Sequence, residues 1–275
     1  MENLLQEKLE EAFAIYEEAK LHAMEGGRSL RATLLLFSGG NDSTVLADIF
    51  HPVVDYAAHA NTGIGVEQTR QFVRDTCKAW GLPLLEKHPK PGRTYRDLVL
   101  GDAISSRGPN KGKRAVWSGF PGPPGHGVMF NWLKDRALRE IRSELVKNPR
   151  KERIIFLSGI RRSESQRRSQ RPKIDRQGSV VWCNPLINWT GDDMRLYRSL
   201  HPDMPHNEVT DFLHMSGECL CGAYAHPGEL EELEMWYPEV AAEIKALEKE
   251  AEARGIPQCK WGRGDGRHCR SGCNT

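Results

Sequence analysis

Apolar residues recur every three or four positions near the start of the chain. Between residues 3 and 24 they are interspersed with acidic residues, which predicts an amphipathic helix that packs on the domain following it. The pair Gly26-Gly27 ends this helix. The apolar positions are Leu5, Leu9, Phe13, Tyr16 and Ala19.

Short apolar runs then alternate with helical patterns as far as residue 157. The runs predict strands, and the segments between them predict helices with one apolar face. This alternation predicts an α/β fold with a doubly wound parallel sheet, in which ligands bind at the carboxyl ends of the strands. The predicted strands are 33–37, 53–60, 82–86 and 153–157, and the predicted helices are 43–50, 66–80, 130–146 and, farther on, 189–200.

The pattern breaks between residues 88 and 128. The segments HPKPGR, SSRGPNKGKR and GFPGPPGHG are basic and rich in glycine and proline. A long loop inside a compact domain is usually functional or mobile. Two interpretations follow: a lid or substrate loop, and a solvated insertion.

The chain changes character from about residue 203. This part holds one long acidic helix predicted at about 228–253 and five of the seven cysteines. We therefore expect an N-terminal helix at 1–28, a larger α/β domain at 29–202 and a small helical, cysteine-rich module at 203–275.

Charge and composition exclude several classes of protein. The 275 residues carry a net charge of only +2, so the chain as a whole lacks the charge excess of many nucleic-acid-binding proteins. No apolar run approaches the ~20 residues that span a bilayer, and the acidic start MENLLQEKLEEAF is not a secretory signal. We expect a cytoplasmic protein whose cysteines are thiols, metal ligands or catalytic groups rather than disulfides.

The stretch LLLFSGGNDSTVLAD at 34–48 combines a buried strand, a glycine-rich turn and the start of a helix. Glycines let the backbone approach a ligand, and the N–H groups and dipole of a helix start attract an anion. The turn has neither the Gly-Lys-Ser/Thr of a Walker A motif nor the GxGxxG of dinucleotide-binding folds. Phosphate is the first ligand to expect, and the alternative is a plain strand-to-helix turn with two flexible glycines.

A second phosphate-facing segment, GIRRSESQRRSQRPK at 159–173, directly follows the strand predicted at 153–157. The planar fork of arginine suits phosphate or sulfate. A solvated charged loop and a nucleic-acid backbone site are the alternatives. Between residues 161 and 176 the chain has two acidic residues, Glu164 and Asp175. It has seven cationic residues: Arg161, Arg162, Arg167, Arg168, Arg171, Lys173 and Arg176.

The motif FSGGNDS resembles the PP-loop of the ATP-pyrophosphatase and phosphoadenosine phosphosulfate (PAPS) reductase superfamily. Four further segments resemble that family in the same order, so the resemblance runs from about residue 30 to residue 240. They are Asn61-Thr62-Gly63 with Gln68-Thr69, similar to D-T-G-x-x-x-x-E-T; 126–134, similar to a region that supplies a lysine; 159–168, similar to G-I/L-R-x-x-E/Q-S-x-x-R; and 185–197, similar to P-L-x-x-W-x-x-x-D-x-x-x-Y.

The resemblance implies an adenine nucleotide alpha hydrolase-like, Rossmann-like fold and a role for each matching residue. Asp42 is expected to help hold Mg²⁺, and the arginines to neutralise charge during group transfer. The expected catalytic residues are Asp42, Arg161, Arg162 and Arg168. The expected nucleotide-binding residues are Ser38, Gly39, Gly40, Asn41, Asp42, Ser43, Asn61, Thr62, Gly63, Lys134, Gly159 and Arg167.

Three departures from the assimilatory reductases bear on the reaction. The chain ends CRSGCNT rather than in a Glu-Cys-Gly-Ile/Leu-His tail, it keeps the SGG-x-DS loop, and it has no Cys-Cys pair. These features favour an ATP-using relative, such as the thiolases of tRNA or the sulfur-inserting enzymes of DNA phosphorothioation. The expected reaction is adenylation with pyrophosphate release, coupled to thiolation. The alternatives are a PAPS or adenosine phosphosulfate reductase that makes sulfite, and a non-catalytic nucleotide- or nucleic-acid-binding module.

The C-terminal cysteines supply enough soft ligands for an iron–sulfur cluster or for zinc. Redox-active or persulfide-carrying thiols, and inert thiols, are the alternatives, whereas Cys77 is expected to pack in the core. The sequence also leaves open a sulfur-donor or reductant protein, a nucleic acid as sulfur acceptor and a homodimer. The first-choice ligands are Cys219, Cys221, Cys269 and Cys273, followed by Cys259, Cys183 and His268.

Overall fold

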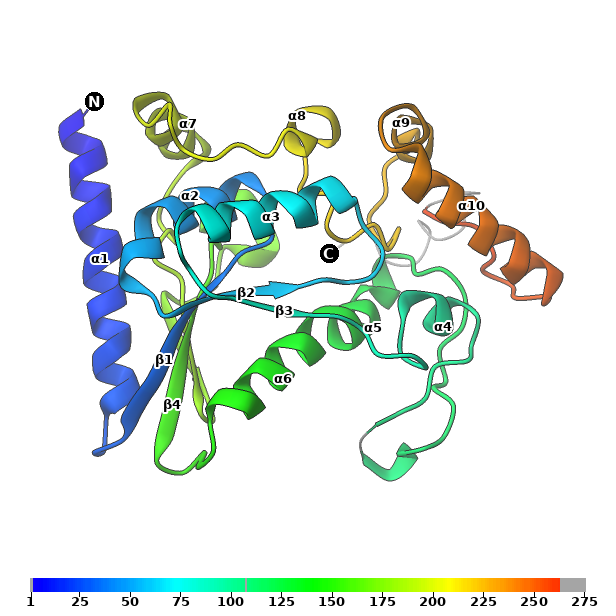
Figure 1. The fold of residues 1–275 in the computed structure, drawn as a ribbon, viewed down its shortest axis with the longest axis horizontal. Coiled ribbons are helices and arrows are strands. Elements are labelled where there is room, and N and C mark those ends of the chain that lie inside the picture. Colours follow the sequence, from blue (N-terminus) through cyan, green and yellow to red (C-terminus); the bar gives the residue numbers. More distant parts are fainter. Residues whose placement is uncertain (1, 107, 263–275) are drawn as a thin grey trace. The chain divides into compact units, whose positions relative to one another are not determined.

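The computed structural model describes residues 2–106 and 108–262 (Figure 1). Its contacts divide the chain into two compact units that are discontinuous in sequence. The first unit comprises Met1–His59, Gln71–Glu86 and Arg139–Glu208, and the second comprises Ala60–Arg70, Lys87–Leu138 and Val209–Thr275. The second unit therefore combines residues of the expected domain 29–202 with residues of the expected module 203–275. The predicted division at residues 28 and 202 stays a prediction.

One six-stranded sheet organises the first unit, with the strand order β3-β2-β1-β4-β6-β5. β1 pairs in parallel with both β2 and β4, β4 pairs in parallel with β6, and β5 runs antiparallel to β6. The predicted α/β fold with a mostly parallel sheet is confirmed. The strands are β1 (Ser29–Leu36), β2 (Tyr56–Ala60), β3 (Leu84–Lys87), β4 (Glu152–Leu157), β5 (Ile174–Gln177) and β6 (Val180–Cys183).

The long periodic helices of the sequence are confirmed, whereas several short ones were not predicted. The unpredicted helices α4, α5 and α8 each span five residues or fewer. The helices are α1 (Glu2–Met24), α2 (Asn41–Phe50), α3 (Glu67–Ala79), α4 (Tyr95–Val99), α5 (His126–Met129), α6 (Arg136–Leu145), α7 (Gly191–Leu200), α8 (Val209–Leu213), α9 (Glu229–Trp236) and α10 (Pro238–Ala253).

Two helix predictions need correction. The acidic helix predicted at 228–253 is two helices, because Tyr237 leaves the helical conformation (φ −139°, ψ 64°) and Pro238 starts α10. Proline lacks an N–H and is tolerated in the first turn of a helix rather than in its interior. The helix predicted at 130–146 opens instead with a π-helical turn, Phe130–Asp135, which runs directly into α6.

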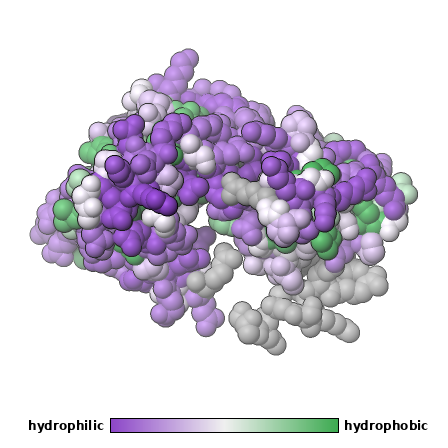
Figure 2. All heavy atoms as spheres, turned by 90° about the horizontal axis from the view of Figure 1, so that it is seen from below, coloured by the Kyte–Doolittle hydropathy of each residue, from purple (hydrophilic) through white to green (hydrophobic). Residues whose placement is uncertain are grey.

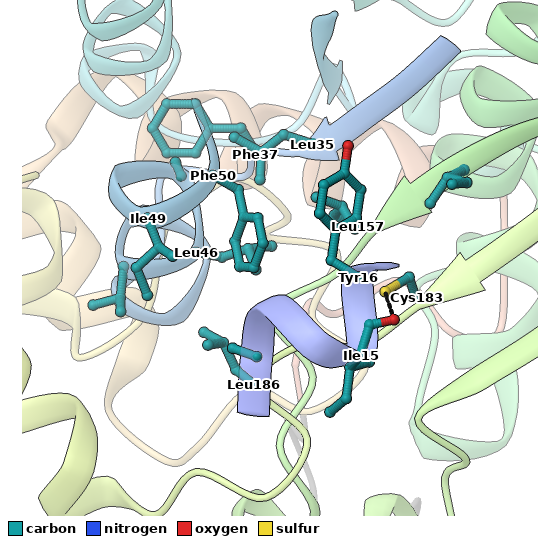
Figure 3. Close-up of a cluster of buried hydrophobic side chains, with 14 of the residues drawn as sticks. Ile15, Tyr16, Leu35, Phe37, Leu46, Ile49, Phe50, Leu157, Cys183 and Leu186 are labelled. Carbon is teal, nitrogen blue, oxygen red and sulfur yellow. Dashed lines mark hydrogen bonds between the residues drawn. The ribbon is translucent and has the colours of Figure 1, made fainter. Parts of the chain in front are cut away.

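The core of the first unit lies between the sheet, α1 and α2 (Figure 3). Phe50 of α2 packs edge-on against Tyr16 of α1, with ring centroids 5.6 Å apart. Cys183 of β6 is fully buried and donates its S–H to the carbonyl of Ile15, 3.8 Å away. Cys77 is buried in the same core, as expected, and burial raises the pKa of its thiol to about 12.

The second unit has a hydrophobic core of its own. Segments from the region 88–128 contribute to it, since Ala103 is fully buried and Phe120 is 1% exposed. The region is therefore not merely a solvated insertion, although its interpretation as a lid or substrate loop stays a prediction. The packed residues include Tyr95, Leu98, Met129, Leu133, Leu220, Leu233, Val240 and Ile244.

Hydrophilic residues predominate on the face shown in Figure 2, and hydrophobic residues are scattered among them. Of the helices in the described part of the chain, none combines the length and the hydropathy needed to cross a bilayer.

Candidate nucleotide-binding site

The glycine-rich turn joins β1 to α2 in the strand–loop–helix arrangement expected from the sequence. Gly39 has a φ of +73°, a conformation that favours glycine. The Ser43 hydroxyl accepts a hydrogen bond from the Ser38 N–H at 3.3 Å and donates one to the Gly40 carbonyl at 2.9 Å. The two serine hydroxyls also lie 3.1 Å apart. The loop is thus held in one shape by its own side chains.

The loop ends at the N-terminus of α2. Its N-cap is Gly40, in an extended conformation, so the cap contributes no side chain to the first-turn N–H groups. A ten-residue helix whose N-terminus follows a glycine-rich turn attracts anions through its dipole and N–H groups. The loop therefore has the geometry of a phosphate site.

Asp42, in the first turn of α2, is bound by an arginine from the second predicted phosphate-facing segment. Arg161 donates from Nε to Asp42 Oδ2 at 2.9 Å and from Nη2 to Asp42 Oδ1 at 3.1 Å. The pair is largely buried, with side-chain exposures of 12% for Arg161 and 26% for Asp42. The two segments that were predicted to share one sheet edge are therefore in direct contact.

Gly159 has no side chain, and this lets the segment after β4 pass close to the start of α2. A Cβ atom at this position would lie 3.0 Å from the Asp42 carbonyl oxygen and 3.3 Å from the Ser43 nitrogen. Those neighbours are backbone atoms of the loop–helix junction, so they cannot move aside as a flexible side chain would. Gly159 is thus required where the segment after β4 passes the start of α2.

Arg168 interacts electrostatically with both members of the Asp42–Arg161 pair. Burial lowers the pKa of its guanidinium, the Asp42 carboxylate opposes that shift, and Arg161 adds to it. Arg168 is also ion-paired with Glu164. A second, partly buried cation therefore lies close to the Asp42–Arg161 pair.

Other cations of the segment are bound elsewhere. Arg162 donates to the Arg171 carbonyl at 3.1 Å and to Asn188 Oδ1 at 2.7 Å, so in this structure it fastens two loops together. Lys173 forms an ion pair with Glu18 of α1 at 2.6 Å, and Arg176 forms one with Glu25, the residue that follows α1, at 3.3 Å. The side chain of Arg167 lies outside the described residues.

Sequence reasoning missed one residue that fastens the loop. The side-chain amide of Asn207 donates to the Gly39 carbonyl at 2.8 Å and is buried. The two residues are 168 positions apart, and HPDMPHNE has no periodic signal that marks Asn207. Tyr197 was recognised only as part of a motif; its hydroxyl donates to Asp48 Oδ2 of α2 at 2.7 Å, and burial together with this bond raises its pKa.

In the second unit, the predicted nucleotide-binding residues 61–63 bind the segment that precedes the cysteine pair. The backbone N–H of Thr62 donates to Glu218 Oε1 at 2.9 Å, and its hydroxyl donates to the Glu218 carbonyl at 2.6 Å. Asn61 accepts a hydrogen bond from the Gly63 N–H at 3.0 Å, which shapes the turn. Glu218 itself is only 2% exposed and lies 3.7 Å from Arg70.

Hydrogen bonds from three directions clamp the stretch Cys219-Leu220-Cys221. Leu220 donates its N–H to the Ile64 carbonyl at 2.9 Å and accepts a bond from the Trp261 indole at 2.8 Å. The Tyr95 hydroxyl donates to the Cys221 carbonyl, also at 2.8 Å. The backbone of the cysteine pair is therefore fixed.

The two thiols and Lys134 interact electrostatically. A hydrogen bond from the Cys221 thiol and the charge of Lys134 lower the pKa of Cys219, and the same hydrogen bond together with burial raises the pKa of Cys221. Lys134 lies in the π-helical turn Phe130–Asp135. Its predicted role in nucleotide binding stays a prediction.

The remaining predicted metal ligands do not join this pair in the described part of the chain. Cys269, Cys273 and His268 lie outside the described residues. Cys259 is partly buried at the edge of the second core, and Cys183 lies in the core of the first unit. No group of three His, Cys, Asp or Glu side chains with the geometry to hold a metal occurs within residues 2–106 and 108–262. The described residues thus offer two of the four thiolates that a cluster or a structural zinc site requires.

Part of the chain is similar to a known protein family, and its fold is similar to several solved structures. No curated protein sequence matches it. The PAPS reductase of Candida auris, solved as a phosphate complex, is 20% identical with a TM-score of 0.46, over 71% of this chain and 83% of that one. An FMN adenylyltransferase of Candida glabrata in complex with ATP is 11% identical with a TM-score of 0.42, over 77% and 65%. The U34-tRNA thiolase NcsA of Methanococcus maripaludis with its 4Fe-4S cluster is 14% identical with a TM-score of 0.41, over 88% and 80%.

The family model of the phosphoadenosine phosphosulfate reductase domain matches residues 131–211. This span includes the arginine segment that follows β4 and the stretch NPLINWT, and the glycine-rich loop precedes it. The resemblance to the phosphoadenosine phosphosulfate reductase family is therefore confirmed over residues 131–211.

Proposed function

We propose that this chain is a PP-loop enzyme that binds an adenine nucleotide at Ser38–Ser43 and acts in sulfur transfer. The nucleotide is ATP, and the reaction is adenylation of an acceptor with release of pyrophosphate, followed by thiolation. One observation carries the proposal: the Asp42–Arg161 pair at the N-terminus of α2, against which Gly159 packs.

The loop and the arginine segment have separate tasks in this proposal. The N–H groups at the start of α2 bind the phosphate chain, with the Ser38 and Ser43 hydroxyls holding the loop in shape. Arg161 and Arg168 neutralise the negative charge that develops on phosphate oxygens during transfer, which is usually the largest electrostatic contribution to catalysis. Asp42 carries a carboxylate of the kind Mg²⁺ prefers. A bound Mg²⁺ would neutralise phosphate charge.

The chemistry balances in two steps. An oxygen of the acceptor attacks the α-phosphorus of ATP, a new P–O bond forms, and pyrophosphate leaves with the electron pair of the broken P–O bond. A hydrosulfide then attacks the activated carbon of the acceptor, a C–S bond forms, and AMP leaves with the electron pair of the broken C–O bond. Where the donor is a persulfide, its outer sulfur makes the same attack, and a second thiol then cleaves the S–S bond and forms a disulfide with the donor cysteine. The sulfur comes from a thiol-based donor, and the cysteines of the second unit are the candidate carriers, as free thiols or around a cluster or zinc.

A second candidate is a sulfonucleotide reductase, and the match of residues 131–211 to the PAPS reductase domain favours it. In that reaction a thiolate attacks the sulfur of the phosphosulfate, and the nucleotide leaves with the S–O bond electrons. A second thiol then displaces sulfite and forms a disulfide. Arg161 and Arg168 would neutralise the sulfate in the same way.

Product analysis separates the two reactions. Protein purified without air is incubated with ATP and Mg²⁺, and in parallel with PAPS and with adenosine phosphosulfate, in the presence of a dithiol reductant. Pyrophosphate from ATP supports the first proposal, and sulfite from a phosphosulfate supports the second. If neither product forms and none of the three nucleotides binds in calorimetry, the assignment of the loop as a nucleotide site is wrong.

A further inference from the structure

The longest stretch of the chain without a carboxylate lies in the second unit. No acidic residue occurs between Asp102 and Asp135, a span that carries five lysines and arginines. Within the described part of this span, residues 103–106 and 108–115 form a hairpin that extends away from α4 (Figure 1). We call this segment the basic hairpin.

Backbone hydrogen bonds define the basic hairpin along its length. Ile104 and Arg114 pair as an antiparallel bridge, the N–H of Ala115 donates to the Ala103 carbonyl at 2.7 Å, and the N–H of Ser105 donates to the Lys113 carbonyl at 2.9 Å. The Gly112 N–H closes the tip by donating to the Ser105 carbonyl at 2.8 Å. The backbone of the hairpin is therefore held in shape by hydrogen bonds from its base to its tip.

Two further bonds fasten its base to the unit. The Ile104 N–H donates to the Gly92 carbonyl at 2.8 Å, and the Ala103 N–H donates to the Asp97 carbonyl at 3.0 Å. Ala103 is fully buried, whereas the side chains beyond it become exposed toward the tip. The hairpin thus stands on the hydrophobic core of the unit.

The side chains on the outer half of the hairpin are cationic. Lys111 and Lys113 are exposed, and neither has a carboxylate within 4 Å among the described residues. Arg114 is 74% exposed and lies 3.4 Å from Asp102. The neighbouring Val116 is 99% exposed, so an aliphatic side chain stands in water beside these charges.

The carboxylates nearest the base are already paired with other arginines. Asp102 accepts a 2.6 Å bond from Arg254, and this bond lowers the pKa of Asp102. Glu250 of α10 is bound by both Arg96 and Arg254. These acids therefore cannot neutralise Lys111 and Lys113 as well, and the hairpin keeps its positive charge.

We propose that the basic hairpin binds the phosphodiester backbone of a nucleic acid, which makes a nucleic acid the acceptor class of the proposed sulfur transfer. A hydrogen-bonded projection that carries Lys111, Lys113 and Arg114 supplies point charges and a planar fork to successive phosphates. Exposed Val116 adds an apolar contact to sugars or base edges. The proposal rests on the proposed function for the role of the nucleic acid, while the binding itself can be measured without any reaction.

Fluorescence anisotropy tests the binding. Labelled 20-mers of single-stranded RNA, single-stranded DNA and duplex DNA are titrated with the full chain at several KCl concentrations, with labelled polyglutamate as an acidic peptide. The variant Lys111→Ala/Lys113→Ala/Arg114→Ala removes three charges. Its matched control is Lys147→Ala/Arg150→Ala/Lys151→Ala, which removes three exposed charges from a turn of the first unit.

The wild type is expected to bind at least one nucleic acid with an affinity that falls steeply with salt. The hairpin variant is expected to lose about tenfold in affinity at low salt and about 2 units of the slope of log K against log salt, since each phosphate contact contributes roughly 0.7–0.9. The control variant is expected to bind like the wild type. Preference for RNA, single-stranded DNA or duplex then identifies the source of the phosphodiester.

Three results would overturn the proposal: no binding of any of the nucleic acids, an equal loss in the control variant, or equal binding of polyglutamate. Binding of ATP by the hairpin variant, measured by calorimetry, separates this proposal from the proposed function. Loss of nucleic-acid binding with unchanged ATP binding supports the hairpin as the binding surface. Wild-type binding by the hairpin variant, whatever the outcome with ATP, refutes it.

Discussion

The guanidinium of Arg161 holds the Asp42 carboxylate through two hydrogen bonds, one to each carboxylate oxygen, at 2.9 and 3.1 Å. The partners are 119 residues apart and come from the two segments that follow the central strands β1 and β4. A planar fork opposite a carboxylate fixes distance and orientation together. This pair therefore sets the position of the arginine segment relative to the start of α2.

Replacing Arg161 is expected to abolish most of the nucleotide chemistry. Arg161→Gln removes both the charge and the fork, so we expect kcat/KM for pyrophosphate release, or for sulfite formation, to fall by about 10²–10³-fold. The matched control is Arg176→Gln, which removes a cation of the same basic stretch that pairs instead with Glu25, the residue after α1. We expect less than about a twofold change there, because an exposed ion pair contributes little. Equal losses in the two variants would refute the specific role of Arg161.

A methyl group at Gly159 is expected to disturb the loop. Gly159→Ala places a Cβ atom 3.0 Å from the Asp42 carbonyl oxygen, so the backbone must shift at the junction that binds phosphate. Overpacking of this kind costs roughly 1–3 kcal/mol. We expect a lower melting temperature and a higher KM for the nucleotide. Gly191→Ala is the control, because its Cβ would make an ordinary 3.5 Å contact at the start of α7. An unchanged KM in Gly159→Ala would contradict the role given to Gly159.

The sequence predicts elements that carry a long periodic signal. The amphipathic pattern of α1 and the apolar run of β1 appear in the structure within a few residues of their predicted bounds. β5 and β6 were missed, because each has only four residues and β5 is polar. Gly178 lies in the turn between them with a positive φ. Nothing in the sequence distinguishes this glycine from any other.

The candidate site was predictable only where a local motif marks it. The loop 38–43 and the segment after β4 each follow a strand, and parallel strands bring their carboxyl ends to one edge. The bond from Asn207 to Gly39 has no such marker, because it depends on how a non-periodic segment returns to the loop. Burial of Glu218 could not be predicted either, since carboxylates are rarely buried without partners and its partners Thr62 and Arg70 are distant in sequence.

Cys219 is expected to react with iodoacetamide at lower pH than an ordinary thiol. The reactive species is the thiolate, so its alkylation rate is low below its pKa and reaches a plateau above it. The hydrogen bond from Cys221 and the charge of Lys134 lower that pKa. We therefore expect the rate to inflect clearly below the usual ~8.5, and Cys221 to stay unreactive at that pH because its pKa is raised.

Site-resolved mass spectrometry of chelator-treated protein measures these rates. Lys134→Met is expected to move the inflection for Cys219 toward the ordinary value. Lys260→Met is the control, since Lys260 pairs with Glu248 and lies next to Cys259 instead. Because the pKa of Cys219 is lower in the folded state than in the unfolded state, its thiolate stabilises the fold at pH values above the pKa of the unfolded thiol. This stabilisation is lost as the pH falls through the lowered pKa of the folded state. An inflection near 8.5 in the wild type would contradict the structure of the pair.

Metal analysis tests whether the cysteine pair supplies ligands. Full-length protein purified without air is expected to carry iron or zinc, and Cys219→Ser/Cys221→Ser is expected to lose it, because a hard hydroxyl is a poor substitute for a soft thiolate ligand. Cys183→Ser is the matched control: this thiol is also buried, but it packs in the other core and donates to the Ile15 carbonyl, so its loss should leave the metal content unchanged. Visible spectra and plasma mass spectrometry distinguish a cluster from zinc. A metal-free wild type, or equal metal in the double variant, would refute the ligand role and leave the pair as free thiols.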